Sequence, residues 1–327
     1  MQLPIAVDIM GGDSAPEVVV EGIRRALASD SDLRVLAVGL PEATATLADV
    51  ARVTCVDASE VIAMDEHPAQ AIRTKKDSSI VVGCHLVKTG QAGAFFSAGS
   101  TGAVMAAATL GIGRIRGVAR PVLATVLPSI DAPVILGDIG ANADCKQEYL
   151  VQFAQMMQAY STAVLGAADP TVRLLNIGEE ETKGSAFAQE CFSALSAHVR
   201  GFAGNIEANE ILTGKAAVVV TDGFTGNVTL KALEGASKLV FSQIKETLGA
   251  SAFSKALVAP LAGRLRALKT RMDPDQFGGA PLLGVKGVVV IGHGSSNATA
   301  IATGIQVAAT ALRNDLTNTI ATALSED

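Results

Sequence analysis

The chain has 327 residues and a formal net charge of −6, and 49% of its residues are hydrophobic. This acidic balance speaks against general nucleic-acid binding, which depends on basic surface. The length predicts one large domain or two lobes, with a core that needs no disulfide or metal for stability. Aromatic residues make up only 4%, so the apolar residues are mainly alanine, valine, leucine and isoleucine, as in a parallel sheet covered by helices.

Three further features exclude other classes of protein. The four cysteines lie far apart and form no C-x-x-C pair, so no metal site is expected. The N-terminal sequence MQLPIAVDIMGGD lacks the basic segment of a secretory signal, and a cytoplasmic location is expected. Residues 89–113 and 287–312 carry no charged side chain, but both contain polar residues in the middle. They indicate a strand, a turn and a helix rather than a membrane span.

Short runs rich in β-branched residues alternate with helical patterns along the chain. The clearest strand predictions, in chain order, are residues 5–8, 34–39, 53–57, 94–97, 122–127, 134–138, 172–177, 217–222 and 288–291. The clearest helix predictions are residues 17–28, 148–165 and 227–248. Strands that alternate with helices are typical of crossover connections, so the sequence predicts an α/β fold with a mostly parallel sheet.

Six of the predicted strands end in a small or polar loop that leads into a helix. These loops are residues 7–13, 96–102, 137–142, 176–184, 221–227 and 292–297. In an open α/β sheet the carboxyl ends of parallel strands share one edge, and ligands bind in the crevice there. One such loop alone would be an ordinary turn. Six loops of the same polarity favour one shared anion-binding crevice.

The familiar nucleotide and hydrolase motifs are absent from the sequence. There is no G-x-x-x-x-G-K-[ST] loop, no G-x-G-x-x-G opening the first helix, no G-x-S-x-G and no H-E-x-x-H. A nucleotide-driven or zinc-driven reaction is therefore not supported, and no cofactor is expected. Loops of this size fit a small phosphate, or phosphate together with a carbonyl substrate.

Nine blocks of the sequence resemble, in order, the signatures of the bacterial phosphate acyltransferase family of phospholipid synthesis. They are VDIMGGDSAPE, RTKKDSS, FSAGSTGA, DIGANADCK, NIGEEETKG, EANEILTGK, VTDGFTGNVTLKALEG, FGGAPLLGVKG and HGSSNA. NIGEEETKG, DGFTGN and HGSSN are the most specific of them. The resemblance implies one domain over residues 1–327, with two α/β/α lobes and a central cleft. That architecture is similar to phosphotransacetylases and isocitrate-type dehydrogenases.

The same resemblance implies the reaction and the partners. Members of the family move a fatty acyl group from acyl carrier protein to inorganic phosphate and need no nucleotide. The acyl phosphate would pass to a membrane glycerol-phosphate acyltransferase on the way to phosphatidic acid. Two positions depart from the family: Ser14 stands where many members have histidine, and Ser100 where many have asparagine. We therefore assign no catalytic base at position 14.

The chemistry of such a transfer indicates which side chains matter. Phosphate is already anionic, so the enzyme must hold it, orient it and stabilise the tetrahedral oxyanion. The candidates for binding phosphate or the acyl substrate are Ser97, Ser100, Thr101, Gly102, Asp138, Asn142, Ser295, Ser296 and Asn297. A leaving thiolate would be helped by a nearby cation or acid. The candidate catalytic residues are Lys183, His293, Asp222 and Asn227.

These assignments have plainer alternatives. Lys183 follows three glutamates and could form a surface salt bridge, and His293 could be a buried core residue. Asp138 and Asp222 could simply cap loops or helices. The charged run Lys75–Lys76–Asp77 could help bind the carrier or phosphate, or it could be a solvated surface.

Residues 248–272 differ from the rest of the chain because they contain basic residues and no acid. The candidate contact residues of this basic arm are Leu257, Leu261, Arg264, Arg266, Lys269 and Arg271. An apolar stripe flanked by basic residues could complete a homodimer interface or a core. It could equally make weak peripheral contact with a membrane, or bind an acidic carrier protein.

Three functions therefore remain open at this stage. The leading one is acyl transfer from acyl carrier protein to phosphate. The second keeps the fold but uses acyl-CoA, as phosphotransacetylases do. The third is a non-catalytic protein that binds phosphate or acyl groups and regulates lipid metabolism.

Overall fold

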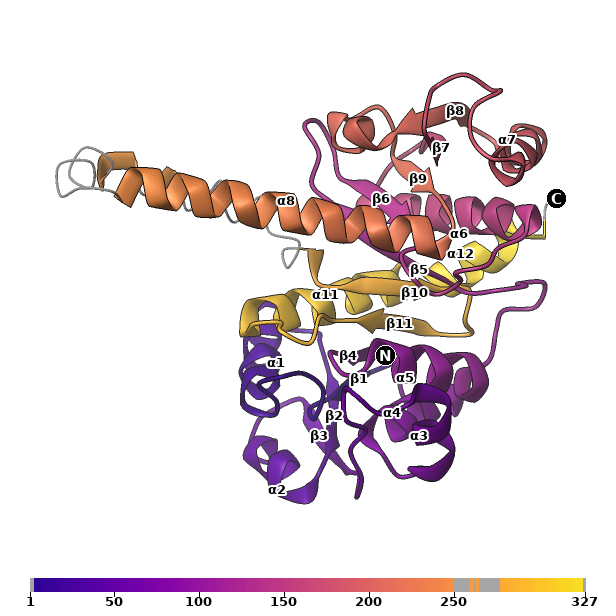
Figure 1. Cartoon of the computed structure of the whole chain (residues 1–327). Helices are drawn as coiled ribbons and strands as arrows, with labels where there is room; N and C mark the ends of the chain where they lie inside the picture. Colours follow the sequence, from indigo (N-terminus) through magenta and orange to yellow (C-terminus); the bar gives the residue numbers. More distant parts are fainter. Residues whose placement is uncertain (1–2, 250–258, 262, 265–276, 326–327) are drawn as a thin grey trace.

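A computed structural model describes every residue except 1–2, 250–258, 262, 265–276 and 326–327. The described residues form one eleven-stranded sheet in the order β3-β2-β1-β4-β11-β10-β5-β6-β9-β7-β8, with helices on both faces (Figure 1). The strands are β1 (Ile5–Asp8), β2 (Val35–Gly39), β3 (Val53–Asp57), β4 (Ala94–Ser97), β5 (Val122–Leu127), β6 (Val134–Gly137), β7 (Val172–Asn176), β8 (Phe202–Glu207), β9 (Val218–Val220), β10 (Ala280–Leu283) and β11 (Val288–Ile291).

The two halves of this sheet run in opposite directions. β1, β2, β3, β4 and β11 are parallel to one another, and so are β6, β7, β8 and β9. Between the halves, β10 pairs antiparallel with both β11 and β5, and β5 pairs antiparallel with β6. The prediction of a mostly parallel sheet is confirmed, with these central reversals added.

The reversal corrects the expectation that all six polar loops share one edge. The loops after β1, β4 and β11 leave one edge of the sheet, and the loops after β6, β7 and β9 leave the opposite edge. The hydrogen bonds agree with this arrangement. Asn142, after β6, donates from Nδ2 to the backbone oxygen of Pro121, which precedes β5, at 2.9 Å. Local sequence patterns reveal where a strand lies but not which way a distant neighbour runs.

All nine predicted strands are present, and two further strands were missed. β8 contains Gly204 and Asn205, and β10 contains Pro281, residue types that are depleted in strands. Tertiary neighbours override these weak propensities. Pro281 lies opposite Val290 of β11, and the side chain of fully buried Asn205 donates to the backbone oxygen of Glu180 at 2.8 Å.

Each face of the sheet has its own layer of helices and its own buried apolar cluster. The helices of the first layer are α1 (Glu17–Ser29), α2 (Pro41–Thr44), α6 (Gln147–Leu165), α7 (Ala186–His198), α11 (Ala298–Arg313) and α12 (Leu316–Ala323). The opposite face carries α3 (Pro68–Thr74), α4 (Ser79–Lys88), α5 (Thr101–Ala107) and the start of α8 (Gly223–Gly249).

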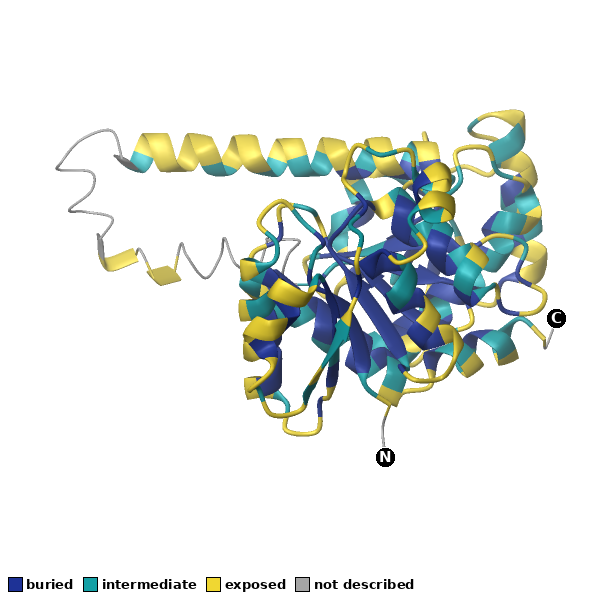
Figure 2. Ribbon diagram, turned by 90° about the horizontal axis from the view of Figure 1, so that it is seen from below, coloured by how far each residue is buried: buried dark blue, intermediate teal, exposed yellow. Residues whose placement is uncertain are grey.

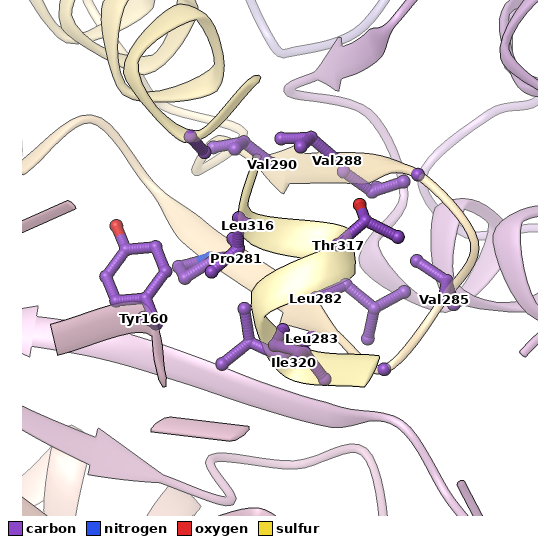
Figure 3. Close-up of a pocket in the computed structure, with 14 residues that line it drawn as sticks. Tyr160, Pro281, Leu282, Leu283, Val285, Val288, Val290, Leu316, Thr317 and Ile320 are labelled. Atoms are coloured by element: carbon purple, nitrogen blue, oxygen red, sulfur yellow. The ribbon is translucent and has the colours of Figure 1, made fainter. Parts of the chain in front are cut away.

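A small internal space lies within the packing of the first layer. Figure 3 shows residues that line it, among them Tyr160, Leu282 and Ile320. Its volume is about 10 Å³, which is at most room for one water molecule. This cavity is therefore a packing feature and not a substrate site.

Helix α8 extends away from the body of the protein (Figures 1 and 2). It has 27 residues and begins at Gly223, four residues before the predicted start. None of its residues described beyond Leu230 is buried, and Leu239, Val240 and Ile244 are exposed. Most of this helix therefore contributes nothing to the core of the described chain.

The basic arm lies largely outside the described residues, which exclude Leu257, Arg266, Lys269 and Arg271. Leu261 ends a short 3-10 turn, Ala259–Leu261, and is 47% exposed, and Arg264 is exposed as well. Within the described part of the chain, no helix is long and apolar enough to cross a bilayer.

Candidate active site

The loops after β1, β4 and β11 contact one another and form what we call the first loop cluster. The backbone N–H of Asp13 donates to the backbone oxygen of Gly294 at 2.8 Å, and that of Gly292 donates to Ser97 at 2.9 Å. The Ser97 hydroxyl in turn accepts a hydrogen bond from the backbone N–H of Gly99 at 3.0 Å. Three segments distant in sequence are thus held together at one edge of the sheet.

A buried carboxylate, Asp8, organises this cluster and was not among the predicted site residues. It accepts hydrogen bonds from the Ser97 hydroxyl at 2.7 Å and the Met10 backbone at 3.0 Å. Burial raises the pKa of Asp8, against the opposing effect of hydrogen bonds from Ser97, Ser79 and Met10. The available signal was a carboxylate ending a buried strand and followed directly by the MGGD loop.

Ser100, Thr101 and Gly102 follow at the start of α5. Ser100 is only 6% exposed, yet its side chain makes no capping bond and has no hydrogen-bond partner among the described residues. Thr101 is exposed. Gly102 has a packing reason to lack a side chain, because a β-carbon there would lie 2.6 Å from the ring of Pro68. Ser100 and Thr101 are thus the hydroxyls of this turn that remain open to a ligand.

The loop after β11 adds the residues from His293 to Asn297. His293 is exposed, so the alternative of a buried core histidine is wrong. Its Nδ1 lies 2.7 Å from the hydroxyl of Ser295, which is also exposed. Ser296 is 9% exposed. Asn297 caps α11, because its side-chain oxygen accepts from the backbone N–H groups of Thr299 and Ala300 at 2.9 and 3.1 Å.

The loops after β6 and β9 form a second cluster at the opposite edge. Asp138 is fully buried and accepts from the backbone N–H groups of Gly140, Ala141 and Asn142 at 3.1, 2.9 and 2.7 Å. The Asn142 side chain adds a fourth bond at 2.8 Å. Burial raises the pKa of Asp138, and these hydrogen bonds oppose that change. Asp138 therefore shapes its own loop.

Asp222 and Asn227 attach the start of α8 to this cluster. Asp222 accepts from the backbone N–H and the hydroxyl of Thr225 at 2.8 and 2.7 Å, so it acts as a helix cap. Asn227 donates from Nδ2 to the backbone oxygen of Ile139 at 3.0 Å. The second cluster is therefore a rigid frame in which the predicted side chains are used mainly for internal bonds.

Lys183 lies on the loop after β7, at the same edge as the second cluster. Its side chain is 48% exposed, and Nζ lies 3.8 Å from a carboxylate oxygen of Glu180. This loose surface pair matches the plainer alternative for Lys183 and contributes little to stability. Since Lys183 and His293 follow strands of opposite direction, the structure does not bring the two predicted catalytic groups to one edge.

Comparison with solved structures shows the same fold at low sequence identity. The chain is similar to a phosphotransacetylase from Streptococcus pyogenes, with a TM-score of 0.62 and 17% identity over 95% of this chain and 94% of that one. It is also similar to a branched-chain phosphotransacylase from Enterococcus faecalis, with a TM-score of 0.61 and 14% identity over 95% and 99%. The likeness to phosphotransacetylase folds implied by the sequence is thereby confirmed.

Sequence comparison is more specific. A family model described as fatty acid synthesis protein matches residues 3–319. A protein of Desulfitobacterium hafniense named phosphate acyltransferase is 48% identical over 93% of this chain and 92% of its own length. One of the same name from Halothermothrix orenii is 44% identical over 99% of both chains. Near-complete coverage at these identities shows that the chain belongs to the phosphate acyltransferase family.

Proposed function

We propose that this protein is an acyltransferase that moves a fatty acyl group from a thioester to inorganic phosphate. The observation that carries the proposal is the first loop cluster, in which touching loops carry Ser100, His293 and Ser295 at one sheet edge. A phosphate oxygen attacks the carbonyl carbon, and the carbon–sulfur bond breaks. The sulfur leaves as a thiolate and takes up a proton, so the products are an acyl phosphate and a thiol.

The first cluster supports separate roles for its residues in this reaction. The hydroxyls of Ser100, Thr101 and Ser295 would donate hydrogen bonds to phosphate or to the oxyanion, and the rigid backbone would limit reorganisation. Asp8 positions the loops from below through Ser97. His293 would deliver a proton to the leaving sulfur, since imidazole is the side chain most often used as a general acid.

The second cluster supports a different role, because its polar groups are already engaged in internal bonds. In our proposal the two halves of the chain form two lobes around a central cleft. Asp138, Asn142, Asp222 and Asn227 then hold the frame of the second lobe. Lys183 would act at this lobe by attracting the anionic donor.

A phosphate-bound crystal would test the assignment of the first cluster. We expect the anion within hydrogen-bond distance of Ser100 or Ser295. An anion seen only beside Asn142, Asn227 or Lys183 would move the phosphate site to the second cluster, and one away from both would refute the assignment.

The donor in our proposal is acyl carrier protein, and acyl-CoA is the second candidate. The likeness to phosphotransacetylases favours the second candidate, but it concerns the fold alone. Purified protein should be supplied with carrier and CoA thioesters of one acyl chain, and acyl phosphate trapped with hydroxylamine. We expect a higher kcat/KM with the carrier thioester. A higher value with CoA would favour a phosphotransacylase, and no product with either would leave a binding protein.

The setting of the enzyme follows from the same proposal. Acyl phosphate would be used by a membrane glycerol-phosphate acyltransferase to make phosphatidic acid, so a cytoplasmic enzyme would gain from weak contact with the bilayer. The basic arm of residues 248–272 supports such contact by partial insertion. Replacing Leu257 and Leu261 by glutamate should abolish binding to anionic liposomes while activity in solution remains. Failure of the wild type to bind at low salt would refute this part.

A further inference from the structure

The first half of the protein carries an open groove that the reaction above leaves unused. Its volume is about 440 Å³, and it lies between the C-terminal end of α3, α4 from Val81 to Lys88, and the π-helical turn Ala108–Ile112 that continues α5. The basic side chains that line it are Arg73, Lys76, His85 and Lys88, and no aspartate or glutamate lines it.

The cations of the groove are exposed and unpaired. Within the described part of the chain, Arg73, Lys76 and Lys88 form no ion pair, although the protein as a whole is acidic. The acids nearby in sequence are engaged elsewhere. Glu66 pairs with Lys75 at 2.5 Å, and Asp77 accepts from the hydroxyl and the backbone of Ser59.

An apolar contact point completes the groove. Leu110 lines it and is 67% exposed, so its side chain is available for contact with a partner. Cationic side chains around an exposed apolar residue are typical of a surface that binds an acidic protein. The cations at the rim attract the acidic partner, and the apolar residue at the centre loses its contact with water on binding. The structure therefore separates Lys76, which faces the groove, from Lys75, which is used internally.

The groove is joined to the first loop cluster by a single helix. Helix α5 starts beside Ser100, and its last residue, Ala107, lines the groove. Its seven residues rise about 10 Å. The neighbouring α3 begins at Pro68, which would touch any side chain at position 102, and carries Arg73 toward the groove.

We propose that this groove is the docking surface for the acidic carrier protein of the acyl donor, an inference that rests on the proposed function. Arg73, Lys76 and Lys88 bind carboxylates of the carrier and the phosphodiester at the base of its prosthetic arm, and Leu110 packs against the carrier. The pantetheine arm is about as long as five extended residues, roughly 17 Å. It can therefore reach along α5 to the first cluster.

Kinetics with three donors of one acyl chain test this docking surface: the carrier thioester, acyl-CoA and acyl-pantetheine. The charge-reversal variant is Arg73→Glu with Lys88→Glu, and Leu110→Ala is the apolar variant. Arg200→Glu is the matched control, because Arg200 is a 94% exposed cation in the turn between α7 and β8, outside the groove. We expect the reversal to lower kcat/KM for the carrier thioester by about 10- to 100-fold. The value for acyl-pantetheine and the KM for phosphate should stay at the wild-type level.

Several results would overturn the proposal. An unchanged kcat/KM for the carrier thioester would exclude docking here. An equal loss of kcat/KM with all three donors would mean that the groove is needed for folding or for the chemical step, not for docking. A loss shared by the carrier thioester and acyl-CoA alone would mean recognition of small phosphate groups, not of a protein. If the wild type does not use the carrier thioester at all, the proposed function fails instead. A fall in carrier kcat/KM with Leu110→Ala alone would support a protein contact.

Discussion

Among single residues, Asp8 and Asp138 have the same structural role, one in each half of the sheet. Asp8 ends β1 and Asp138 directly follows β6, and each is buried and accepts hydrogen bonds from the loop that follows it. A buried carboxylate is costly unless hydrogen-bonded, so such a residue holds its loop in one conformation. Loops held in one conformation can stabilise a transition state well, because no free energy is spent on rearranging the protein during the reaction.

The Asp8 carboxyl should show itself in the pH dependence of stability. Burial raises its folded-state pKa above the ordinary value of 3.8, so the folded protein binds the proton more tightly than the unfolded chain. The contribution to the free energy of unfolding therefore falls as pH rises from 3.8 through the raised pKa, and is constant above it. In Asp8→Asn this fall should be missing. Urea titrations across pH measure it, and a wild-type-minus-variant difference that stays constant with pH would contradict the expectation.

The kcat values of single-residue variants should show whether the reaction takes place at the first or the second loop cluster. If His293 donates the proton, His293→Ala should lower kcat by roughly ten- to ten-thousand-fold with folding intact. Lys183→Ala should act mainly on the KM for the acyl donor. A large fall in kcat for Lys183→Ala, with His293→Ala active, would place the reaction at the second cluster. Ser100→Ala tests the hydroxyl at the start of α5 that makes no capping bond.

At the scale of elements, α8 combines a tightly fixed start with a long unsupported remainder. Its first turn is attached to the second cluster through Asp222 and Asn227. A β-carbon at Gly226 would collide with the backbone oxygen of Asp138, so the absence of a side chain lets the helix approach the loop. Gly235, further along the same helix, has open space around it.

Two glycine-to-alanine changes in α8 should therefore have opposite effects. Gly226→Ala should lower the free energy of unfolding by about 1–3 kcal/mol because backbone must move, and it should reduce activity through the displaced loop. Gly235→Ala should raise it by about 0.5–1 kcal/mol, because alanine favours a helix interior. Thermal and urea unfolding of the two variants side by side make the measurement. Equal effects would show that the contact with Asp138 is unimportant.

At the scale of the whole molecule, the C-terminal segment returns to complete the first half of the sheet. β11 pairs with β4, and α11 packs beside α1 where Ile301 closely approaches Gly22. The second half is thus inserted between two parts of the first. Among the residues that the structure describes, the exposed length of α8 stands outside this arrangement, and we propose that a second copy of the chain covers its apolar side chains.

The expected assembly can be tested on α8 itself. Charges buried in a dimer interface are costly, so Leu239→Glu with Val240→Glu should convert a dimer into a monomer. Ser242→Glu, at an exposed polar position of the same helix, is the matched control. Sedimentation velocity at micromolar concentration distinguishes the two masses. A monomeric wild type, or a dimer that survives the double change, would show that α8 is not the interface.

Sequence patterns predicted most of the strands, the polar loops that follow them and the family of this protein. Runs of β-branched residues predicted nine strands because buried parallel strands need continuous apolar sequence. The polar loops predicted that Ser97, Asp138 and Asp222 would sit where strands end. In the structure Ser97 ends β4, Asp138 directly follows β6 and Asp222 lies two residues after β9. The family followed from the loop sequences, because loops carry the residues that bind and react.

Which of those loops meet depends on how the strands pair across the sheet. The two halves of the sheet run in opposite directions because β5 and β10 pair antiparallel with their neighbours. Strand propensity did not predict β10, because proline is depleted in strands and β10 contains Pro281. The structure also decided that His293 is exposed, that Asn297 is a cap, and that Asp8 lies beneath the first cluster. The basic groove brings together residues from three segments, a proximity that no local pattern encodes. Contacts between distant segments arise from packing of the whole chain, so a linear pattern can propose a site but cannot assemble it.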